Sequence, residues 1–419
     1  MTGAPPLTGY RVLELGSTVA GPFCGRLLAD FGAEVIKVEP PDGDPVRAMG
    51  SHAEGKSLYA ASILRNKRLV SLDLRKPQAQ DLVRKLAGQV DVVIENFRPG
   101  TLEKWGLGPD ALEALNPGLI IVRISGFGQT GPYRDRPGYG FLGDAVGGML
   151  HINGYPDRAP VRAAVPVTDM TTGIYGAFGV AMALLSRQKT GKGQCIDASL
   201  FESAFSLMES HVAPFEKLGK VAMRAGSRLP GSTPNNLFPT NDGGYIAMAA
   251  ASDSVFRRLA TVMQQPQLAL DERFATGMAR VRNQDILDGI ISDWTRTFSL
   301  SDLEPMLQAN DVPASRIYTM ADIFEDPHYA ARGTIAHVTG GEFDSVAMPA
   351  PVPRLTGTPG VIRHAGGAVG CDTAAVLREL AAVTPEQMAQ LHADGVVFDA
   401  ALSAAAADSA RARHAAETL

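Results

Sequence analysis

The 419-residue sequence contains little cysteine, with three residues at positions 24, 195 and 371. They lie far apart, none forms a Cys-x-x-Cys pair, and none has the Cys/His spacing of a zinc site. We therefore expect no disulfide framework, no bound metal, and a reducing location such as the cytoplasm. Residues 1–15 also lack the basic segment and long apolar stretch of a signal peptide.

Neither sign of charge dominates, because 39 Lys and Arg face 44 Asp and Glu, for a formal net charge of −5. A nucleic-acid partner is not expected, since its binders concentrate basic residues. Long apolar runs are missing too. The longest uncharged one, residues 170–185, is shorter than the roughly 18–20 residues that span a bilayer. We interpret it as a buried helix and predict no membrane association.

Several catalytic signatures are absent as well. No G-x-G-x-x-G or P-loop follows a predicted strand, which argues against hydride transfer with NAD. The eight histidines are scattered and form neither H-x-x-x-H nor H-x-H, which disfavours metal catalysis. No G-x-S-x-G elbow is present, which disfavours an α/β-hydrolase.

What the sequence does contain is a regular alternation of β-branched runs and helical patterns in its first 130 residues. Strands are predicted at residues 11–15, 34–38, 70–74, 91–94 and 119–124, and helices at 20–31, 77–86 and 109–115. This alternation predicts an α/β fold with a Rossmann-like, doubly wound parallel sheet.

After residue 125 the composition changes to Gly/Pro-rich loops, of a length that is usually functional. Further on, strands are predicted at 195–199, 244–249 and 315–319, and helices at 168–185, 201–219, 254–262, 284–298, 301–308 and from 373. A polar Pro/Gly connector at 224–240 marks the start of a second, smaller α/β block. The tail, residues 400–416, is Ala-rich and is expected to be a frayed helix or disordered.

Asp169 lies in AAVPVTDMTTGIYGAFG, between an extended segment and an apolar helix. An Asp at such a place is typical of an N-cap, whose carboxylate accepts a backbone N–H at the helix start. The same place allows a second role, because a carboxylate at a helix N-terminus stays ionised and can attack an acyl group. The local residues leave both roles open.

Six segments in order resemble the family III CoA-transferases, the group of formyl-CoA transferase, carnitine CoA-transferase and the α-methylacyl-CoA racemases. They are VLELGSTVAGPFCGRLLADFGAEVIKVEPPDGDPVR, NKRLVSLDLR, DVVIENFRPGTLEKWG, NPGLIIVRISGFGQTGP, VTDMTTG and KTGKGQCIDASLFESA. The likeness runs almost end to end and fades in the Ala-rich tail.

The resemblance implies transfer of CoA from an acyl-CoA donor to a free carboxylic acid, with Asp169 as the nucleophile. An aspartyl–acyl anhydride and an aspartyl-CoA thioester would be the intermediates, with coenzyme A entering as the acyl-CoA substrate and no permanently bound cofactor. It also implies an interlocked homodimer with its active sites at the subunit interface. The large domain would be built from residues 1–222 and 329–419, and a small α/β domain, 223–328, would be inserted between them.

The same resemblance places coenzyme A on the N-terminal sheet. The residues expected to bind it are Val19, Ala20, Leu72, Asp73, Leu74, Arg75, Asn96, Phe97, Arg98, Lys104, Arg136, Pro137, Gly138 and Tyr139. Arg and Lys suit the phosphates of CoA. A solvated strand end is the alternative interpretation of Arg75, Arg98 and Lys104.

The acyl group is expected to differ from formate and oxalate. Val19 stands where the formyl-CoA transferases have a glutamine, Pro40 stands where they have an arginine, and residues 249–252 replace their glycine-rich flap. The connector arginines Arg224 and Arg228 would suit a second carboxylate.

Succinyl-CoA is therefore the expected donor and a dicarboxylic acid such as succinate, malate, citramalate or glutarate the acceptor. The substrate residues expected in the connector are Arg228, Asn235 and Asn236. Surface or dimer contacts are the alternative role for the arginines.

Two other functions stay open. An α-methylacyl-CoA racemase needs a histidine where this chain has Tyr139, and tyrosine is a poor base for α-proton exchange at neutral pH. His151 is near in sequence but lies in a different loop context. A CoA-binding regulatory protein without catalysis is the third possibility.

Overall fold

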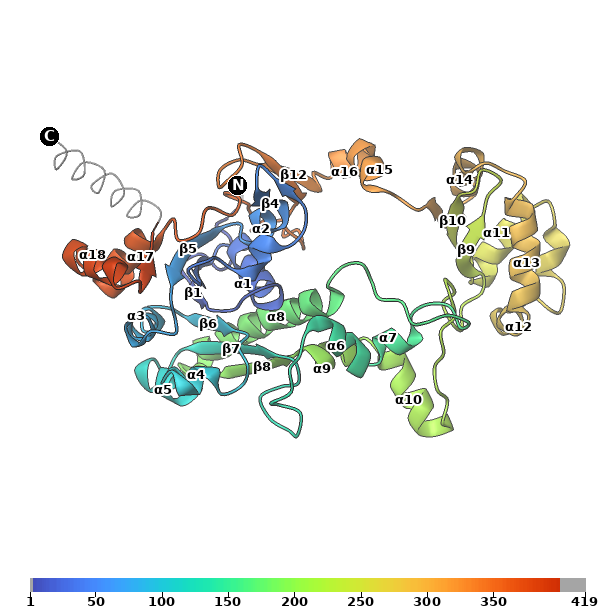
Figure 1. Ribbon diagram of the computed structural model, residues 1–419. Helices are drawn as coiled ribbons and strands as arrows, with labels where there is room; N and C mark the ends of the chain where they lie inside the picture. Colours follow the sequence, from blue (N-terminus) through green and yellow to red (C-terminus); the bar gives the residue numbers. More distant parts are fainter. Residues whose placement is uncertain (1–2, 400–419) are drawn as a thin grey trace. The chain divides into compact units, whose positions relative to one another are not determined.

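Seven strands form the central sheet of the computed structural model, which describes residues 3–399 (Figure 1). Their order across the sheet is β14 (Val397–Phe398), β5 (Lys67–Leu72), β2 (Glu34–Glu39), β1 (Arg11–Glu14), β6 (Val92–Glu95), β7 (Ile120–Ser125) and β8 (Cys195–Ser199). All neighbours are parallel except β14, which pairs antiparallel with β5. The predicted parallel sheet is confirmed.

Helices cover both faces of this sheet. One apolar core joins the sheet to α3 (Pro77–Ala87), α5 (Pro109–Leu115), α17 (Thr373–Ala381) and α18 (Pro385–Ala393). The core on the other face contains α1 (Ala20–Asp30) and α8 (Val167–Thr190). Because both faces are covered, β7 is buried along its whole length and β2 is buried except at Glu34, although β2 also carries the charged residues Lys37 and Glu39.

The chain divides into two units. The larger contains residues 1–149, 163–213 and 333–419, and the smaller contains 150–162 and 214–332. The predicted boundaries after residues 222 and 328 lie close to two of these divisions, but the predicted division did not assign 150–162 to the smaller unit. The remaining elements of the larger unit are η1 (Pro45–Ala48), β3 (His52–Ala53), β4 (Lys56–Ser57), α2 (Leu58–Ile63), α4 (Thr101–Lys104), α6 (Gly140–Val146), α9 (Leu200–Ser206), β12 (Ile335–Val338) and β13 (Val346–Pro349).

The smaller unit has its own apolar core around a three-stranded antiparallel sheet in the order β11-β10-β9. Its elements are β9 (Asn235–Pro239), β10 (Tyr245–Ala249), α11 (Asp253–Val262), η2 (Pro266–Ala269), α12 (Gly277–Arg282), α13 (Gln284–Thr295), α14 (Leu300–Ala309), β11 (Ala314–Arg316), α15 (Met320–Glu325) and α16 (Pro327–Ala331). Two helices, α7 (Met149–Ile152) and α10 (Glu209–Leu218), cross the divisions between the units.

Several predicted elements change length. The helix expected at 168–185 is the longer α8, which continues until Gly191 adopts a left-handed C-cap. The single helix expected at 201–219 is instead α9 and α10, separated at 207–208. The predicted tail helix at 400–416 lies outside the described residues.

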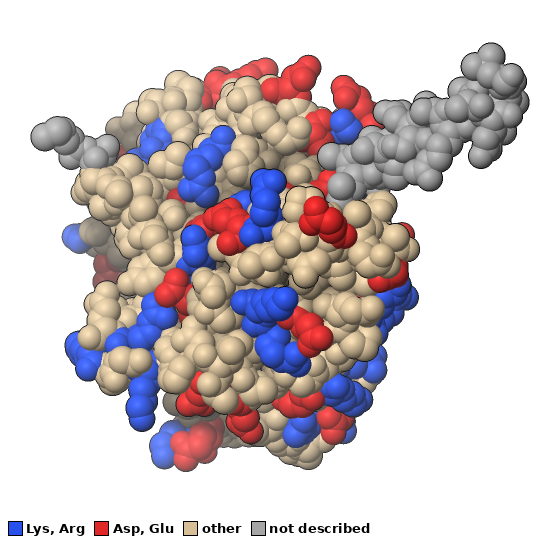
Figure 2. All heavy atoms as spheres, turned by 90° about the vertical axis from the view of Figure 1, so that its left-hand side faces the viewer, with Lys and Arg blue, Asp and Glu red and all other residues tan. Residues whose placement is uncertain are grey.

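The surface carries both signs of charge. Figure 2 shows acidic and basic side chains intermixed on one face of the molecule, in keeping with the near balance in the sequence. Across residues 3–399, no helix is both long and apolar enough to cross a bilayer.

Candidate active site

A pocket lies at the carboxyl ends of β1, β6 and β7, and we call it the Asp169 pocket. Its lining consists of Ser17, Thr18, Val19, Ala20, Asn96, Phe97, Arg98, Pro99, Ile124, Ser125, Gly126, Arg134, Arg136, Pro137, Gly138, Tyr139, Asp169 and Leu200. The chain runs outward from β1 through β2 to β5 on one side, and from β6 through β7 to β8 on the other. The pocket therefore occupies the switch point at which ligands bind in doubly wound sheets.

Asp169 is the third residue of α8. The N-cap position belongs to Pro166, which makes no side-chain cap, so the interpretation of Asp169 as an N-cap is wrong. The carboxylate still lies in the first turn of a 24-residue helix, where the helix dipole favours its ionised form. An ionised carboxylate that faces a pocket has the charge state a nucleophile needs.

Gly140, the first residue of α6, lets the Asp169 carboxylate approach the backbone. A Cβ atom at position 140 would lie 2.0 Å from Oδ2 and 2.7 Å from Cγ of Asp169. Beside it, the hydroxyl of Thr168 donates a hydrogen bond to Asp144 of α6. The start of α8 is thus held against α6, and a side chain at position 140 would require the Asp169 carboxylate to move.

The loop that carries Arg134 and Arg136 reaches the pocket through another close approach. A Cβ at Gly126, just after β7, would lie 2.6 Å from the Cα of Gly138, so two backbones touch there. Arg136 stacks on Tyr133, with its guanidinium carbon 3.5 Å from the ring centroid. With Arg98, these arginines line the same pocket as the Asp169 carboxylate, and their positive charge complements a phosphate-bearing ligand.

A second pocket lies at the ends of β2 and β5, and we call it the strand-end pocket. Its lining is Leu15, Ser17, Val38, Glu39, Pro40, Pro41, Asp42, Pro45, Leu72, Asp73, Leu74, Arg75, Phe97 and Trp105. Ser17 and Phe97 line both pockets, so the two are neighbours. Phe97 and Trp105 meet edge to face, 5.1 Å between centroids, and give this pocket an aromatic wall.

Most of the residues predicted to bind CoA therefore lie in these two pockets, but Lys104 does not. Lys104 is an exposed residue of the four-residue helix α4 and lines neither pocket. Arg75 lines the strand-end pocket, and its guanidinium forms two hydrogen bonds to Asp73, of 2.7 and 2.9 Å.

The predicted substrate residues lie in the smaller unit. Asn235 and Asn236 of β9 line a shallow surface pocket. Arg228 forms ion pairs with Asp285 at 2.7 Å and Asp288 at 2.8 Å, so two of its N–H groups already have acceptors. The structure places these residues in a different unit from Asp169.

Several site residues had not been predicted. Tyr59 of α2 is one: burial first, and then the negative charge of Asp169, raise the pKa of its hydroxyl, which has no hydrogen-bond partner among the described residues. Ser17, Thr18 and Arg134 are others, and their only signal was a position beside predicted residues. Tyr139 lines the Asp169 pocket, whereas His151 belongs to the smaller unit.

The described residues bring together no group of three or more His, Cys, Asp or Glu able to hold a metal. The groups available for chemistry are the Asp169 carboxylate and the arginines that line the same pocket, next to the strand-end pocket with its aromatic wall.

The chain is similar to known proteins over most of its length. The profile of CoA-transferase family III matches residues 7–373. Succinyl-CoA--D-citramalate CoA-transferase of Chloroflexus aurantiacus is 46% identical over 394 residues, 94% of this chain and 98% of that protein. The β subunit of succinyl-CoA--L-malate CoA-transferase from the same organism is 39% identical over 397 residues, again 94% and 98%.

A solved structure agrees with these relatives. The crystal structure of a CaiB/BaiF family protein from Brucella suis has a TM-score of 0.80 and 36% identity, covering 90% of this chain and 100% of that one. The chain belongs to CoA-transferase family III, as its motifs had indicated. It is a CoA-transferase, an enzyme whose substrates are CoA thioesters and carboxylic acids.

Proposed function

We propose that this enzyme transfers CoA from succinyl-CoA to a dicarboxylic acid, with Asp169 as the covalent nucleophile. The observation that carries the proposal is the position of the Asp169 carboxylate, which lies in the first turn of α8 and lines a pocket with three arginines. A carboxylate exchanges acyl groups without a metal when the leaving group is a thiolate.

The reaction has four steps. The Asp169 carboxylate attacks the thioester carbonyl, and CoA leaves as a thiolate, which gives an aspartyl–succinyl anhydride. The thiolate attacks the aspartyl carbonyl, which releases succinate and leaves an aspartyl-CoA thioester. The acceptor carboxylate attacks the carbonyl of that thioester, which forms a second anhydride and expels the CoA thiolate. The thiolate then attacks the acceptor's acyl carbon, which yields the new CoA ester and free Asp169.

The two pockets are suited to different parts of the CoA molecule. The strand-end pocket, with the ring pair Phe97–Trp105, suits the adenine, and Arg98, Arg134 and Arg136 suit the phosphates on the way to Asp169. Backbone N–H groups near the reacting carbonyl would stabilise each tetrahedral intermediate, by about 3 kcal/mol per donor.

The relatives support the choice of substrates. Both similar enzymes are named for succinyl-CoA as donor, and their acceptors, D-citramalate and L-malate, are hydroxylated dicarboxylic acids. We infer succinyl-CoA as the donor and a dicarboxylic acid of this size as the acceptor for this chain.

A homodimer belongs to the proposal. The exposed face of α8 carries large apolar side chains at helical spacing, each 42–60% exposed: Ile174, Tyr175, Phe178, Met182 and Leu185. An exposed apolar stripe of this kind marks a protein–protein contact. We infer that a second copy of the chain covers it, because the stripe lies on the helix that carries Asp169 and family members share their sites between subunits.

The test is an incubation of the pure protein in D₂O with succinyl-CoA, 2-methylacyl-CoA and a set of mono- and dicarboxylic acids. Mass spectrometry of all CoA esters should show a new dicarboxylyl-CoA without deuterium at its α-carbon. Asp169→Asn should lower the transfer rate by at least about a thousandfold. Asp293→Asn is the control, because this exposed carboxylate of the smaller unit lines neither pocket and pairs with Arg296, which lines neither pocket either. Deuterated 2-methylacyl-CoA without any transfer would instead establish a racemase.

Hydroxylamine gives a second readout of the intermediate. After incubation with succinyl-CoA it should convert Asp169, and no other acidic residue, to a hydroxamate. An enzyme that transfers CoA but yields no modified Asp169 would contradict the covalent route.

A further inference from the structure

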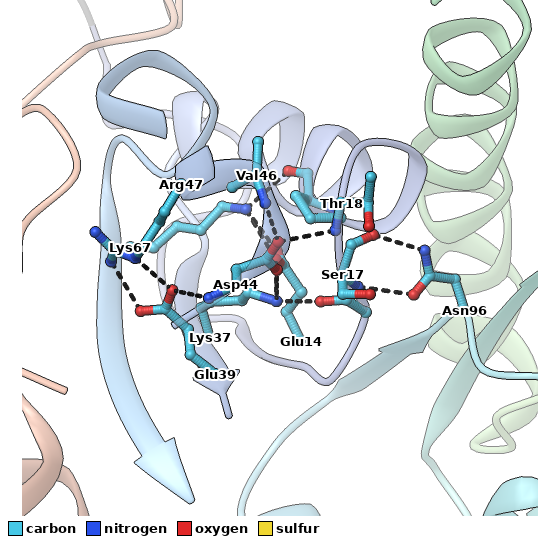
Figure 3. A network of polar contacts seen from close by, with 12 residues as sticks. Glu14, Ser17, Thr18, Lys37, Glu39, Asp44, Val46, Arg47, Lys67 and Asn96 are labelled. Carbon is cyan, nitrogen blue, oxygen red and sulfur yellow. Dashed lines mark hydrogen bonds and ion pairs between the residues drawn. The ribbon is translucent and has the colours of Figure 1, made fainter. Parts of the chain in front are cut away.

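The loop between β1 and α1 is held by an unusual number of polar contacts (Figure 3). It contains Ser17 and Thr18 and leads into Val19 and Ala20, and all four residues line the Asp169 pocket. The side chain of Asn96 forms two hydrogen bonds with the backbone of Ser17. Its Oδ1 accepts from the Ser17 N–H at 2.7 Å, and its Nδ2 donates to the Ser17 carbonyl at 2.8 Å.

Thr18 adopts a backbone conformation that is sterically unfavourable for its β-branched side chain. Its φ is +68°, in the left-handed region that β-branched residues avoid. Such a conformation persists only where the surroundings impose it. Here the Thr18 N–H donates to Oδ1 of Asp44 at 2.9 Å, and the same oxygen accepts the Val46 N–H at 2.9 Å.

Asp44 belongs to a buried charge cluster under the loop. Lys37 lies 2.8 Å from the Asp44 carboxylate, and its ammonium also donates to the carbonyl of Gly16. Burial alone would lower the pKa of Lys37 and raise that of Asp44. The attraction between the two charges outweighs burial, so the pKa of Lys37 is raised and that of Asp44 is lowered. Lys67 and Glu14 form the second pair, at 2.7 Å.

Buried ion pairs of this kind are poor stabilisers, because the cost of removing both charges from water offsets their attraction. We therefore explain the buried Asp44 by its effect on the position of the loop, since its carboxylate accepts a hydrogen bond from the loop backbone. With Glu39, which accepts from the Asp44 N–H, and its partner Arg47, the cluster has three carboxylates against three cations. It therefore holds the loop without adding net charge beside the pocket.

We infer that Asp44 is a positioning residue of the transfer reaction: its hydrogen bond to the Thr18 N–H holds the β1–α1 loop, and thereby Val19 and Ala20, in place beside Asp169. The inference rests on the proposed function, in which Asp169 is the nucleophile. A merely structural role for Asp44 predicts that activity follows stability in every variant.

Two substitutions separate these roles. Asp44→Asn keeps an oxygen for the Thr18 N–H but removes the charge that pairs with Lys37. Asp44→Ala removes both. Both should lower the melting temperature, because Lys37 loses its closest carboxylate. Only Asp44→Ala should lower kcat, by about tenfold or more at a temperature where all variants are folded. The Asn variant should stay within about threefold of the parent.

Asp30→Ala is the matched control, since Asp30 is a buried carboxylate paired with Arg65 at 2.6 Å and lines neither pocket. It should lose stability and keep kcat. If Asp44→Ala does not fold, the double variant Lys37→Met/Asp44→Ala takes its place. Lys37→Met alone is then its control, because Lys37 also donates to the Gly16 carbonyl of the loop. A kcat that falls equally in both Asp44 variants, or in neither, overturns the inference.

Hydrogen exchange of the peptide spanning residues 13–24 is measured without substrate. It therefore tests whether Asp44 holds the loop independently of the proposed function. Exchange should be faster in Asp44→Ala than in the parent and in Asp44→Asn. If Asp169→Asn transferred CoA normally, the proposed nucleophile would be wrong, while this exchange would still decide whether Asp44 anchors the loop. Unchanged exchange in Asp44→Ala would overturn the inference regardless of activity.

Discussion

The contact between Gly140 and Asp169 allows a substitution whose effect can be worked out from distances. Gly140→Ala adds one methyl group, whose Cβ would lie 2.0 Å from Oδ2 of Asp169. Carbon and oxygen atoms that are not bonded stay above roughly 3 Å, so the carboxylate must move by about 1 Å. The carboxylate is the end of a short, rotatable side chain, and it can turn away without displacing backbone.

Activity and stability should therefore separate. A reacting group displaced by about 1 Å costs on the order of 10²-fold in rate. The cost to the fold should stay at or below the ~1 kcal/mol lower end of overpacking effects, because the clash is relieved by rotation. Position 140 is also the first residue of a helix, and alanine has a higher helix propensity than glycine. This gain in stability partly offsets the cost of the clash.

The assay is steady-state CoA transfer from succinyl-CoA, together with thermal unfolding of the same samples. We expect kcat to fall by about a hundredfold, with a melting temperature within a few degrees of the parent. Gly289→Ala is the control, because Gly289 lies within a helix of the smaller unit and a Cβ there meets nothing within 4 Å. A Gly140→Ala enzyme with the parent's kcat would show that the carboxylate does not act from this position.

Two further predictions concern the ligand and the partner. Arg98→Ala should raise the KM for succinyl-CoA by about tenfold, because a charge-assisted bond to a phosphate is lost; equal KM values for the two enzymes would remove Arg98 from the CoA site. Phe178→Asp places a charge in the middle of the apolar stripe of α8 and should convert a dimer to a monomer, with loss of activity. Light scattering during size-exclusion chromatography measures this, and an unchanged dimer would assign the stripe another role.

The strands were predictable because each carries its own signal. β1, β7 and β8 were expected within one residue of their observed ends, and for β1 and β7 the signal was an aliphatic run of the kind that forms buried parallel strands. β5 was expected at 70–74 but begins at Lys67, because its first two residues are charged. The break between α9 and α10 was missed, because a continuous helical pattern at 201–219 conceals it. The extension of α8 was missed for a related reason, since its last turn is polar and carries no apolar period.

For the site, the residues predicted to bind CoA, with the exception of Lys104, line the Asp169 pocket or the strand-end pocket. Val19, Asn96, Arg98, Tyr139 and Asp169 come from four separate segments of the chain and line one pocket. Parallel strands bring their carboxyl ends to the same edge of the sheet, so segments that follow different strands meet there. Lys104 lines neither pocket, because α4 begins six residues after the end of β6 and Lys104 is exposed there, whereas its neighbour Trp105 lines the strand-end pocket.

The sequence by itself determined the class of the fold, the family and the residue expected to carry the chemistry, because these depend on local patterns and on the order of motifs. Only the tertiary structure decided that Asp169 is the third residue of α8 rather than its N-cap, that its carboxylate lies against Gly140, and that Asp44 holds Thr18 in a left-handed conformation. The last two facts depend on distances of a few ångströms between residues 26 or more positions apart, and no pattern along the chain encodes such a distance.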